Sequence, residues 1–106
     1  MFARKVTMQL KPYTVAEFTR LMDMEIIPLL RKQKGFLDEA SFLLPGEKEV
    51  FGISFWELKE HADNYNISVY PQVTKLLDKY LEKPPQVETF EVLNSTFHKF
   101  VARVAA

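Results

Sequence analysis

The chain contains no cysteine, only three glycines, no excess of either charge and no long apolar run. Without cysteine it can form neither disulfides nor thiolate metal sites, and we expect a reducing, cytoplasmic location. No apolar stretch approaches the roughly 20 residues of a membrane-spanning helix, and the early charged residues argue against a signal peptide. Fourteen basic residues balance fourteen acidic ones, so no basic block favours nucleic acid. We therefore expect neither a membrane nor a nucleic-acid partner.

What the chain does have is enough apolar sequence for one core. Its 106 residues are 47% hydrophobic and include nine phenylalanines, a composition that excludes disorder and predicts a single domain over residues 1–106. A domain of this size buries only about two thirds of the surface of its unfolded chain. A second subunit is therefore a natural way to bury more.

Hydrophobic periodicity predicts six elements in the order strand, helix, strand, strand, helix, strand. Strands are indicated by alternation over 2–10 and by apolar runs over 36–44, 49–57 and 87–97. Helical spacing runs from 15 to 33 and from about 59 to 83, with an interruption at 67–71. Pro45 and Gly46 are typical of the turn of a hairpin.

Local signals mark the ends and the irregularities of the first helix. Thr14 and Glu17 have the spacing of a capping box. Pro28 lies inside the helical stretch and removes one backbone hydrogen bond, which predicts a kink over 24–28. Gly35 follows a basic last turn and is the natural residue to end the helix in a left-handed conformation.

The strand over 49–57 is apolar on both faces, which predicts that both faces are covered. The two sets are Phe51, Ile53 and Phe55 on one face and Val50, Gly52, Ser54 and Trp56 on the other. The element order is that of an α+β, ferredoxin-like β-α-β-β-α-β fold, an antiparallel sheet with both helices on one face. We expect the open face to carry Val50, Ser54 and Trp56 and to form a homodimer.

The run from Gly35 to Tyr65 resembles the core of the antibiotic biosynthesis monooxygenase family. It has a Gly-Phe pair after the first helix, a hairpin, a strand that ends in Trp56 and an acidic residue, and then a helix. This resemblance implies a dimeric α+β barrel in which each subunit holds a pocket between sheet and helices. It also implies a cofactor-independent monooxygenase of an aromatic phenol or quinol, with a small hydrophobic or aromatic ligand as partner.

The resemblance implies Trp56, Asn64 and Tyr65 as candidate catalytic residues around the substrate. Trp56 matches the strand-end tryptophan of the family, and Tyr65 falls where many members carry a histidine. Tyr70 and Asn94 are further polar groups that could line the pocket. The resemblance implies no cofactor, because in the cofactor-free enzymes of the family the deprotonated substrate itself passes an electron to dioxygen.

The haem-degrading branch of this superfamily has an Asn on the first strand and a Trp and an iron-binding His ten residues apart on the second helix. Those positions here hold Val6, Tyr65 and Lys75. A lysine is a poor iron ligand beside an imidazole. We therefore do not expect haem degradation.

Several residues favour no site of their own. His61 and His98 lie far apart with no carboxylate at ligand spacing, so we expect no metal site. Asp38 and Glu39 are neighbours on a strand, must point to opposite faces, and cannot act as paired carboxylates. We expect residues 98–106 to form a tail or a swapped arm. The alternative is a non-catalytic dimeric protein of the same fold that binds small molecules or takes part in a stress response.

Overall fold

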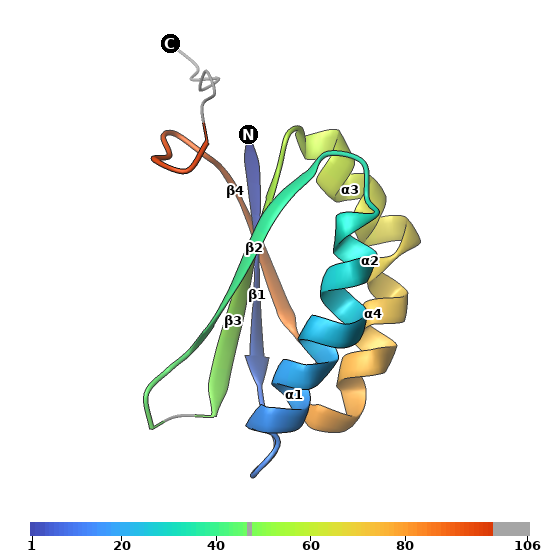
Figure 1. The fold of residues 1–106 in the computed structure, drawn as a ribbon, viewed down its shortest axis with the longest axis vertical. Coiled ribbons are helices and arrows are strands. Elements are labelled where there is room, and N and C mark those ends of the chain that lie inside the picture. The colour runs from blue at the N-terminus through green and yellow to red at the C-terminus, as the bar shows by residue number, and fades with distance from the viewer. Residues whose placement is uncertain (47, 99–106) are drawn as a thin grey trace.

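The computed structural model describes residues 1–46 and 48–98, which form two layers. A sheet makes up one layer and the helices lie together on one of its faces (Figure 1). The elements in chain order are β1 (Phe2–Gln9), α1 (Val15–Leu21), the π-helix η1 (Met22–Ile26), α2 (Ile27–Arg31), β2 (Phe36–Leu43), β3 (Glu49–Trp56), α3 (Lys59–Ser68), α4 (Tyr70–Leu77), the 3-10 helix η2 (Asp78–Tyr80) and β4 (Gln86–Glu91). The predicted α+β, ferredoxin-like fold is confirmed.

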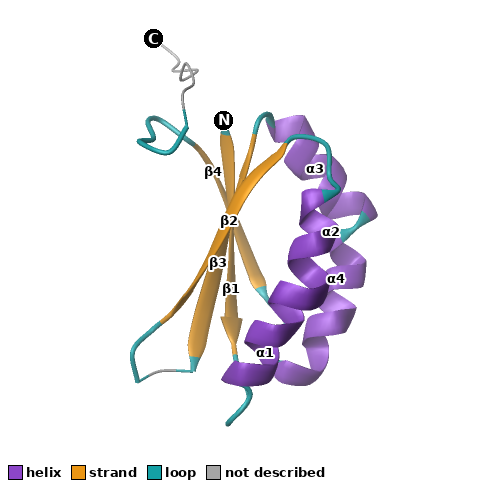
Figure 2. Cartoon of the chain, viewed as in Figure 1, coloured by secondary structure: helices purple, strands orange, loops and turns teal. Residues whose placement is uncertain are grey.

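The four strands are antiparallel and lie in the order β2-β3-β1-β4. The first strand is therefore in the middle of the sheet, between β3 and β4. Phe2 of β1 lies opposite Trp56 on one side and Glu91 on the other. Figure 2 shows this sheet as one orange layer beside the purple helices. None of the helices in 1–46 and 48–98 is long and apolar enough to cross a membrane.

The predicted kink of the first helix is a one-turn change of helix type. Residues Met22–Ile26 form the π-helix, and Pro28 sits in the first turn of the α-helix that follows. Proline cannot donate a backbone hydrogen bond and crowds the preceding turn, so a wider turn before it relieves both effects. The interruption of the second helix is also confirmed, since α3 ends at Ser68 and α4 begins at Tyr70.

The capping box predicted at the start of α1 is wrong. The side chain of Thr14 makes no capping hydrogen bond. Its hydroxyl instead donates to the carbonyl oxygen of Lys11, at 2.7 Å. The side chain thus bonds to the turn that precedes the helix and makes no bond to the backbone N–H groups of the first helical turn.

The prediction for the two faces of β3 is wrong as well. Val50, Ser54 and Trp56 are buried beneath the helices, and the ring of Trp56 lies 5.1 Å from that of Tyr65 on α3. The open face instead carries Phe51, Ile53 and Phe55, which occupy the alternate positions. Alternation separates two sets of side chains but does not say which set lies under the helices when both are apolar.

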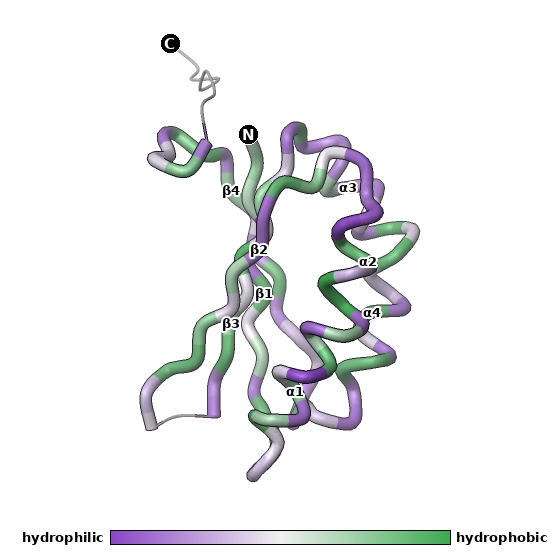
Figure 3. Tube along the Cα trace, viewed as in Figure 1, coloured by the Kyte–Doolittle hydropathy of each residue, from purple (hydrophilic) through white to green (hydrophobic). Residues whose placement is uncertain are grey.

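The open face of the sheet is rich in aromatic side chains. Phe42 and Phe90 are each 46% exposed, and the rings of Phe42 and Phe51 stack at 4.9 Å. The ammonium of Lys5 lies 4.9 Å from the centre of the Phe51 ring. Figure 3 shows that hydrophobic segments run along β2 and β3 as well as along the helices. The sheet thus has an apolar surface on the side away from its helices.

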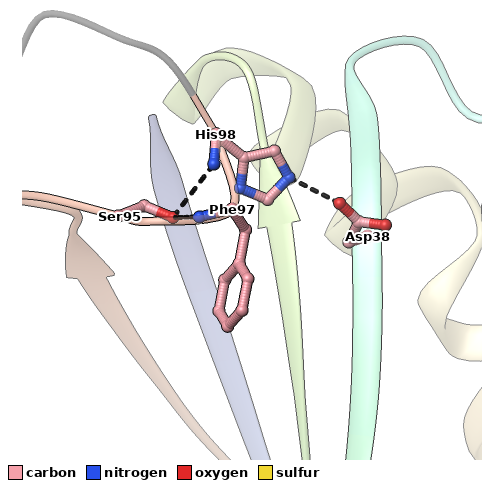
Figure 4. Close-up of polar contacts among 4 residues, drawn as sticks. All are labelled: Asp38, Ser95, Phe97 and His98. Carbon is pink, nitrogen blue, oxygen red and sulfur yellow. Dashed lines mark hydrogen bonds and ion pairs between the residues drawn. The ribbon is translucent and has the colours of Figure 1, made fainter.

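Strand β4 is shorter than predicted, because the chain leaves the sheet after Glu91 and turns toward the open face. There the ring of His98 packs on Phe55 and its Nε2 pairs with the carboxylate of Asp38 (Figure 4). The backbone N–H groups of Phe97 and His98 donate to the hydroxyl of Ser95. Of the predicted tail over 98–106, only His98 lies among the described residues.

We predict that replacing Gly35 by alanine destabilises the fold far more than the same change at Gly46. Both glycines have positive φ, 81° and 72°, as their sequence positions indicated. A Cβ at Gly35 would lie 1.9 Å from Nδ1 of His61, whereas a Cβ at Gly46 would meet no atom of the described residues within 4 Å.

Gly46→Ala should lower the free energy of unfolding by about 1 kcal/mol, the cost of the backbone conformation. Gly35→Ala should cost roughly 1–3 kcal/mol more, because the helix must also move. Urea denaturation of both variants measures the difference. Adding His61→Ala to Gly35→Ala should restore part of the loss, and equal effects at the two glycines would contradict the clash.

Candidate functional site

A cavity of about 50 Å³ lies between the middle of the sheet and the helices. Most of its wall is apolar and comes from β1, the bent first helix and α4: Val6, Met8, Met22, Ile26, Leu30, Val73 and Leu77. Its sheet side includes Gly52 and Ser54, the two small residues of the helix-facing row of β3. The sheet and the helices fail to meet here because neither residue is large enough to fill the gap.

Arg4 brings a buried positive charge to this cavity. Its side chain extends from β1 toward the helices and is only 3% exposed. One guanidinium nitrogen donates to Oδ1 of Asn66 at 2.8 Å. The guanidinium also lies over two aromatic rings, 4.0 Å from the centre of Tyr70 and 5.2 Å from that of Tyr65. Burial lowers the pKa of Arg4 below its ordinary value, and its aromatic neighbours oppose that change.

Glu39 brings a carboxyl group from β2 to the same cavity. Burial raises its pKa above 4.5, and the hydrogen bond that the Ser41 hydroxyl donates to Oε2, at 2.7 Å, opposes this rise. Across the sheet, Glu39 lies opposite Ser54, and Ser54 lies opposite Arg4. With strands about 4.8 Å apart, the Cα atoms of the acid and the base in this row are roughly 10 Å apart, which leaves room for a ligand between the two side chains.

Two tyrosines line the cavity on the helix side. Burial raises the pKa of Tyr65 to about 12, so its hydroxyl stays protonated at neutral pH and can donate a hydrogen bond. Burial also raises the pKa of Tyr70, against the effect of the nearby Arg4. The Tyr70 hydroxyl is buried and has no hydrogen-bond partner within 1–46 and 48–98. A ligand in the cavity could satisfy that hydroxyl.

The three residues expected around the substrate are not brought together. Tyr65 lines the cavity. Trp56 is fully buried, and its indole N–H donates to the Ser54 hydroxyl at 2.9 Å, so it supports the cavity from behind. Asn64 is exposed on α3 and does not line the cavity. Among the further polar candidates, Tyr70 lines the cavity, whereas Asn94 is exposed in the loop after β4.

Sequence reasoning missed Arg4, Glu39 and Asn66. The signal for Arg4 was present: it occupies a core-facing position of the first strand, in phase with Phe2 and Val6. A charged residue in such a row needs a partner or a function. The prediction that Asp38 and Glu39 point to opposite faces is confirmed, since Asp38 contacts His98 on the open face and Glu39 reaches the cavity.

No group of three histidine, aspartate or glutamate side chains lies close enough to hold a metal ion in the part of the chain that the structure describes. Val6, which stands at the Asn position of the haem-degrading branch, is part of the apolar wall of the cavity. Lys75 is exposed on α4. Neither residue offers an imidazole or an amide to a bound haem.

Comparison with known families shows no family profile that matches the sequence, and no curated protein matches it either. Solved structures do match. The monooxygenase from the gene ActVA-Orf6 of Streptomyces coelicolor, solved with nanaomycin D, superposes with a TM-score of 0.75, covers 92% of both chains and is 16% identical. A conserved protein of Methanosarcina mazei gives a TM-score of 0.69, covers 85% of this chain and 91% of its own, and is 22% identical.

A Bordetella bronchiseptica protein described as a candidate antibiotic biosynthesis monooxygenase gives a TM-score of 0.71 at 16% identity, over 88% of this chain and 98% of its own. Identities this low establish a shared fold and leave the chemistry to be argued from the residues. The resemblance predicted from the run Gly35 to Tyr65 is confirmed at that level: the chain has the fold of the antibiotic biosynthesis monooxygenases.

Proposed function

We propose that this protein is a cofactor-independent monooxygenase that converts a small aromatic phenol or quinol to a quinone. The observation that carries the proposal is the row of Glu39, Ser54 and Arg4 at one cavity between the sheet and the helices. A carboxylate with a raised pKa and a buried cation facing the same space are what the deprotonation of a phenol requires. The fold shared with a Streptomyces coelicolor monooxygenase supports the same proposal.

In this proposal Glu39 is the general base. A carboxylate whose pKa is raised by burial holds a proton more firmly than one in water, which brings its basicity closer to that of a phenolate. Glu39 accepts the phenolic proton and becomes neutral. The negative charge then resides on the substrate, within a largely apolar wall.

Arg4 and Tyr65 stabilise that charge. The buried guanidinium offsets it electrostatically, at a strength that water would greatly reduce. Tyr65 remains protonated, because its pKa is about 12, and donates a hydrogen bond to the phenolate oxygen. Trp56 does not touch the substrate; it holds the Ser54 hydroxyl in place through its indole N–H.

The electrons come from the substrate. The phenolate gives one electron to dioxygen, and the resulting radical and superoxide combine at a ring carbon that carries hydrogen, ortho or para to the oxygen. The peroxide formed there takes back the proton held by Glu39. The O–O bond of this hydroperoxide then breaks as the C–H proton of the same carbon leaves, which releases water and forms the second carbonyl. Overall, one phenol and one dioxygen give one quinone and one water.

The size of the cavity limits the substrate. A space of about 50 Å³ accepts a few heavy atoms, whereas complete burial of one ring requires the wall to move. Met8 and Met22 belong to that wall, and their unbranched, flexible side chains can change rotamer at low cost. Met22 also begins the π-helix, a form of helix that is frequent at functional sites. We therefore propose substrates of one ring.

We predict dioxygen uptake with single-ring hydroquinones and phenols, measured with an oxygen electrode against a buffer control. Glu39→Gln should lower kcat/KM by about 10²-fold or more, because the amide cannot accept the proton. Asp38→Asn is the matched control. It changes the adjacent carboxylate, which faces the other side of the sheet, and should leave the rate within about twofold.

The pH profile of kcat/KM gives a second measurement. Glu39 must be ionised to act, so the rate should rise with pH through the pKa of Glu39, which lies above the usual carboxyl value. Glu39→Gln should lose this rise while Asp38→Asn keeps it. Absence of uptake with every phenol tested would exclude the oxygenase, and uptake unaffected by Glu39→Gln would exclude Glu39 as the base.

The alternative is a non-catalytic protein that binds a small molecule in the same cavity. The narrowness of the space favours it, since a few heavy atoms fit without movement. Four polar side chains around one space favour chemistry instead, because passive apolar binding does not require them: Arg4, Glu39, Tyr65 and Tyr70. Saturable binding of a phenol with no oxygen uptake would select the binding protein.

We further propose that the protein acts as a homodimer through the open face of the sheet. That face carries Phe42, Phe51, Ile53, Phe55 and Phe90. An apolar surface of this kind on a small domain marks an interaction site. A symmetric pair uses the same patch twice, so the aromatic rows of two copies would meet.

We predict that Ile53→Lys converts this dimer to a monomer, because two buried ammonium groups would face each other near the dimer axis. Ile67→Lys is the control, since Ile67 is 75% exposed on α3, away from the sheet. Sedimentation equilibrium at micromolar concentration measures both. A wild-type protein that sediments as a monomer would overturn the dimer, and an Ile53→Lys dimer would overturn the choice of face.

A further inference from the structure

Arg4 is a buried cation that the protein itself leaves partly uncompensated. A guanidinium carries five N–H donors, and the side chain of Arg4 is 3% exposed. Its one side-chain hydrogen bond within 1–46 and 48–98 goes to Asn66, a neutral amide. Taking a charge out of water costs several kcal/mol unless an opposite charge or several hydrogen bonds replace the water.

No carboxylate of the described chain provides that compensation. The ion pairs there are Lys59 with Asp63 and His98 with Asp38, and both lie away from the cavity. Glu39 reaches the cavity but does not pair with Arg4. The rings of Tyr65 and Tyr70 contribute cation–π attraction, which is weaker than an ion pair. The site is therefore short of one negative group.

The space beside Arg4 fits such a group. A water needs roughly 10–15 Å³ of cavity volume of this kind, so 50 Å³ holds a group of three or four heavy atoms. The buried Tyr70 hydroxyl, which has no partner within the described residues, adds a donor at the same wall. A carboxylate has three heavy atoms and matches the flat fork of the guanidinium in two parallel hydrogen bonds.

We propose that Arg4, with the hydroxyl of Tyr70, binds the carboxylate of the ligand, and that the substrate class is the hydroxylated aromatic carboxylic acids. The second half of this proposal rests on the proposed oxygenation; the first half does not. The carboxylate occupies the Arg4 end of the cavity, and the ring extends toward Glu39, where the phenolic proton is removed. With such a substrate Arg4 pairs with the carboxylate and acts on the phenolate only across the ring, and Tyr65 donates the hydrogen bond to the phenolate oxygen. A phosphate or sulfate ester is larger, and the site has one cation to meet its charge.

The test compares benzoate with benzamide, which has the same shape without the charge. Each compound is titrated into ¹⁵N-labelled wild-type protein at pH 7 and followed by amide chemical shifts. Benzoate should shift the amides around Arg4, Ser54 and Tyr70 saturably, and benzamide should bind at least about tenfold more weakly, the effect of losing a charged hydrogen-bonded pair. Equal binding of the two compounds, or no saturable binding of benzoate, overturns the proposal.

Two variants locate the carboxylate. Arg4→Gln should abolish the preference for benzoate, whereas Arg31→Gln removes the same charge from the exposed end of α2 and should leave it unchanged. Tyr70→Phe keeps the aromatic ring beside the guanidinium and should weaken the binding of benzoate by about three- to tenfold. If Arg4→Gln does not fold, an unchanged benzoate affinity in Tyr70→Phe still contradicts a role for the Tyr70 hydroxyl. The comparison of benzoate with benzamide in the wild-type protein still tests whether the site recognises the negative charge.

The experiment separates this proposal from the oxygenase. Benzoate has no phenolic hydroxyl and needs no turnover to report binding. Benzoate binding without oxygen uptake from any hydroxybenzoate overturns the oxygenation and the substrate class while retaining the carboxylate site. Oxygen uptake with neutral hydroquinones, together with equal binding of benzoate and benzamide, retains the oxygenase and overturns the carboxylate site.

Discussion

The packing of one row of side chains under the helices sets the form of this molecule. The helix-facing row of β3 runs from Val50 through Gly52 and Ser54 to Trp56, large at its ends and small in the middle. Trp56 is completely buried and packs against one ring from each layer. Its ring centre lies 5.5 Å from that of Phe36 in the sheet and 5.1 Å from that of Tyr65 in the helices. Large side chains at the ends keep the layers apart, and small ones in the middle cannot fill the gap, so a cavity remains.

Burying charged groups at that cavity costs free energy, which the packing of the rest of the fold must offset. Burial lowers the pKa of Arg4 and raises that of Glu39, which means that it disfavours the ionised form of each group. The two side chains face one cavity from strands on either side of β3 and form no pair that would relieve the cost. Groups held in this way are typical of sites that bind or transform a ligand.

The two faces of the sheet differ in what they contact, and neighbouring residues place their side chains on opposite faces. Asp38 meets His98 on the open side, while Glu39 turns into the cavity. Along β3, Phe51 and Phe55 are directed outward, and Ser54 between them is directed inward. The fold shared with monooxygenase structures of low sequence identity accounts for the two layers. The acid, the cation and the tyrosines at the cavity are properties of this chain's own residues.

The sequence by itself determined what depends on neighbours in the chain. The element order follows from periodicity, the irregular turn follows from Pro28, and the positive φ of Gly35 and Gly46 follows from their places after a helix and in a hairpin. Only the tertiary structure decided which face of β3 lies under the helices, because both faces are apolar and alternation treats them alike. It also decided the site. Arg4 and Glu39 come from two strands, and Tyr65 and Tyr70 come from two helices far from them in sequence. They meet only because the helices fold back over the sheet.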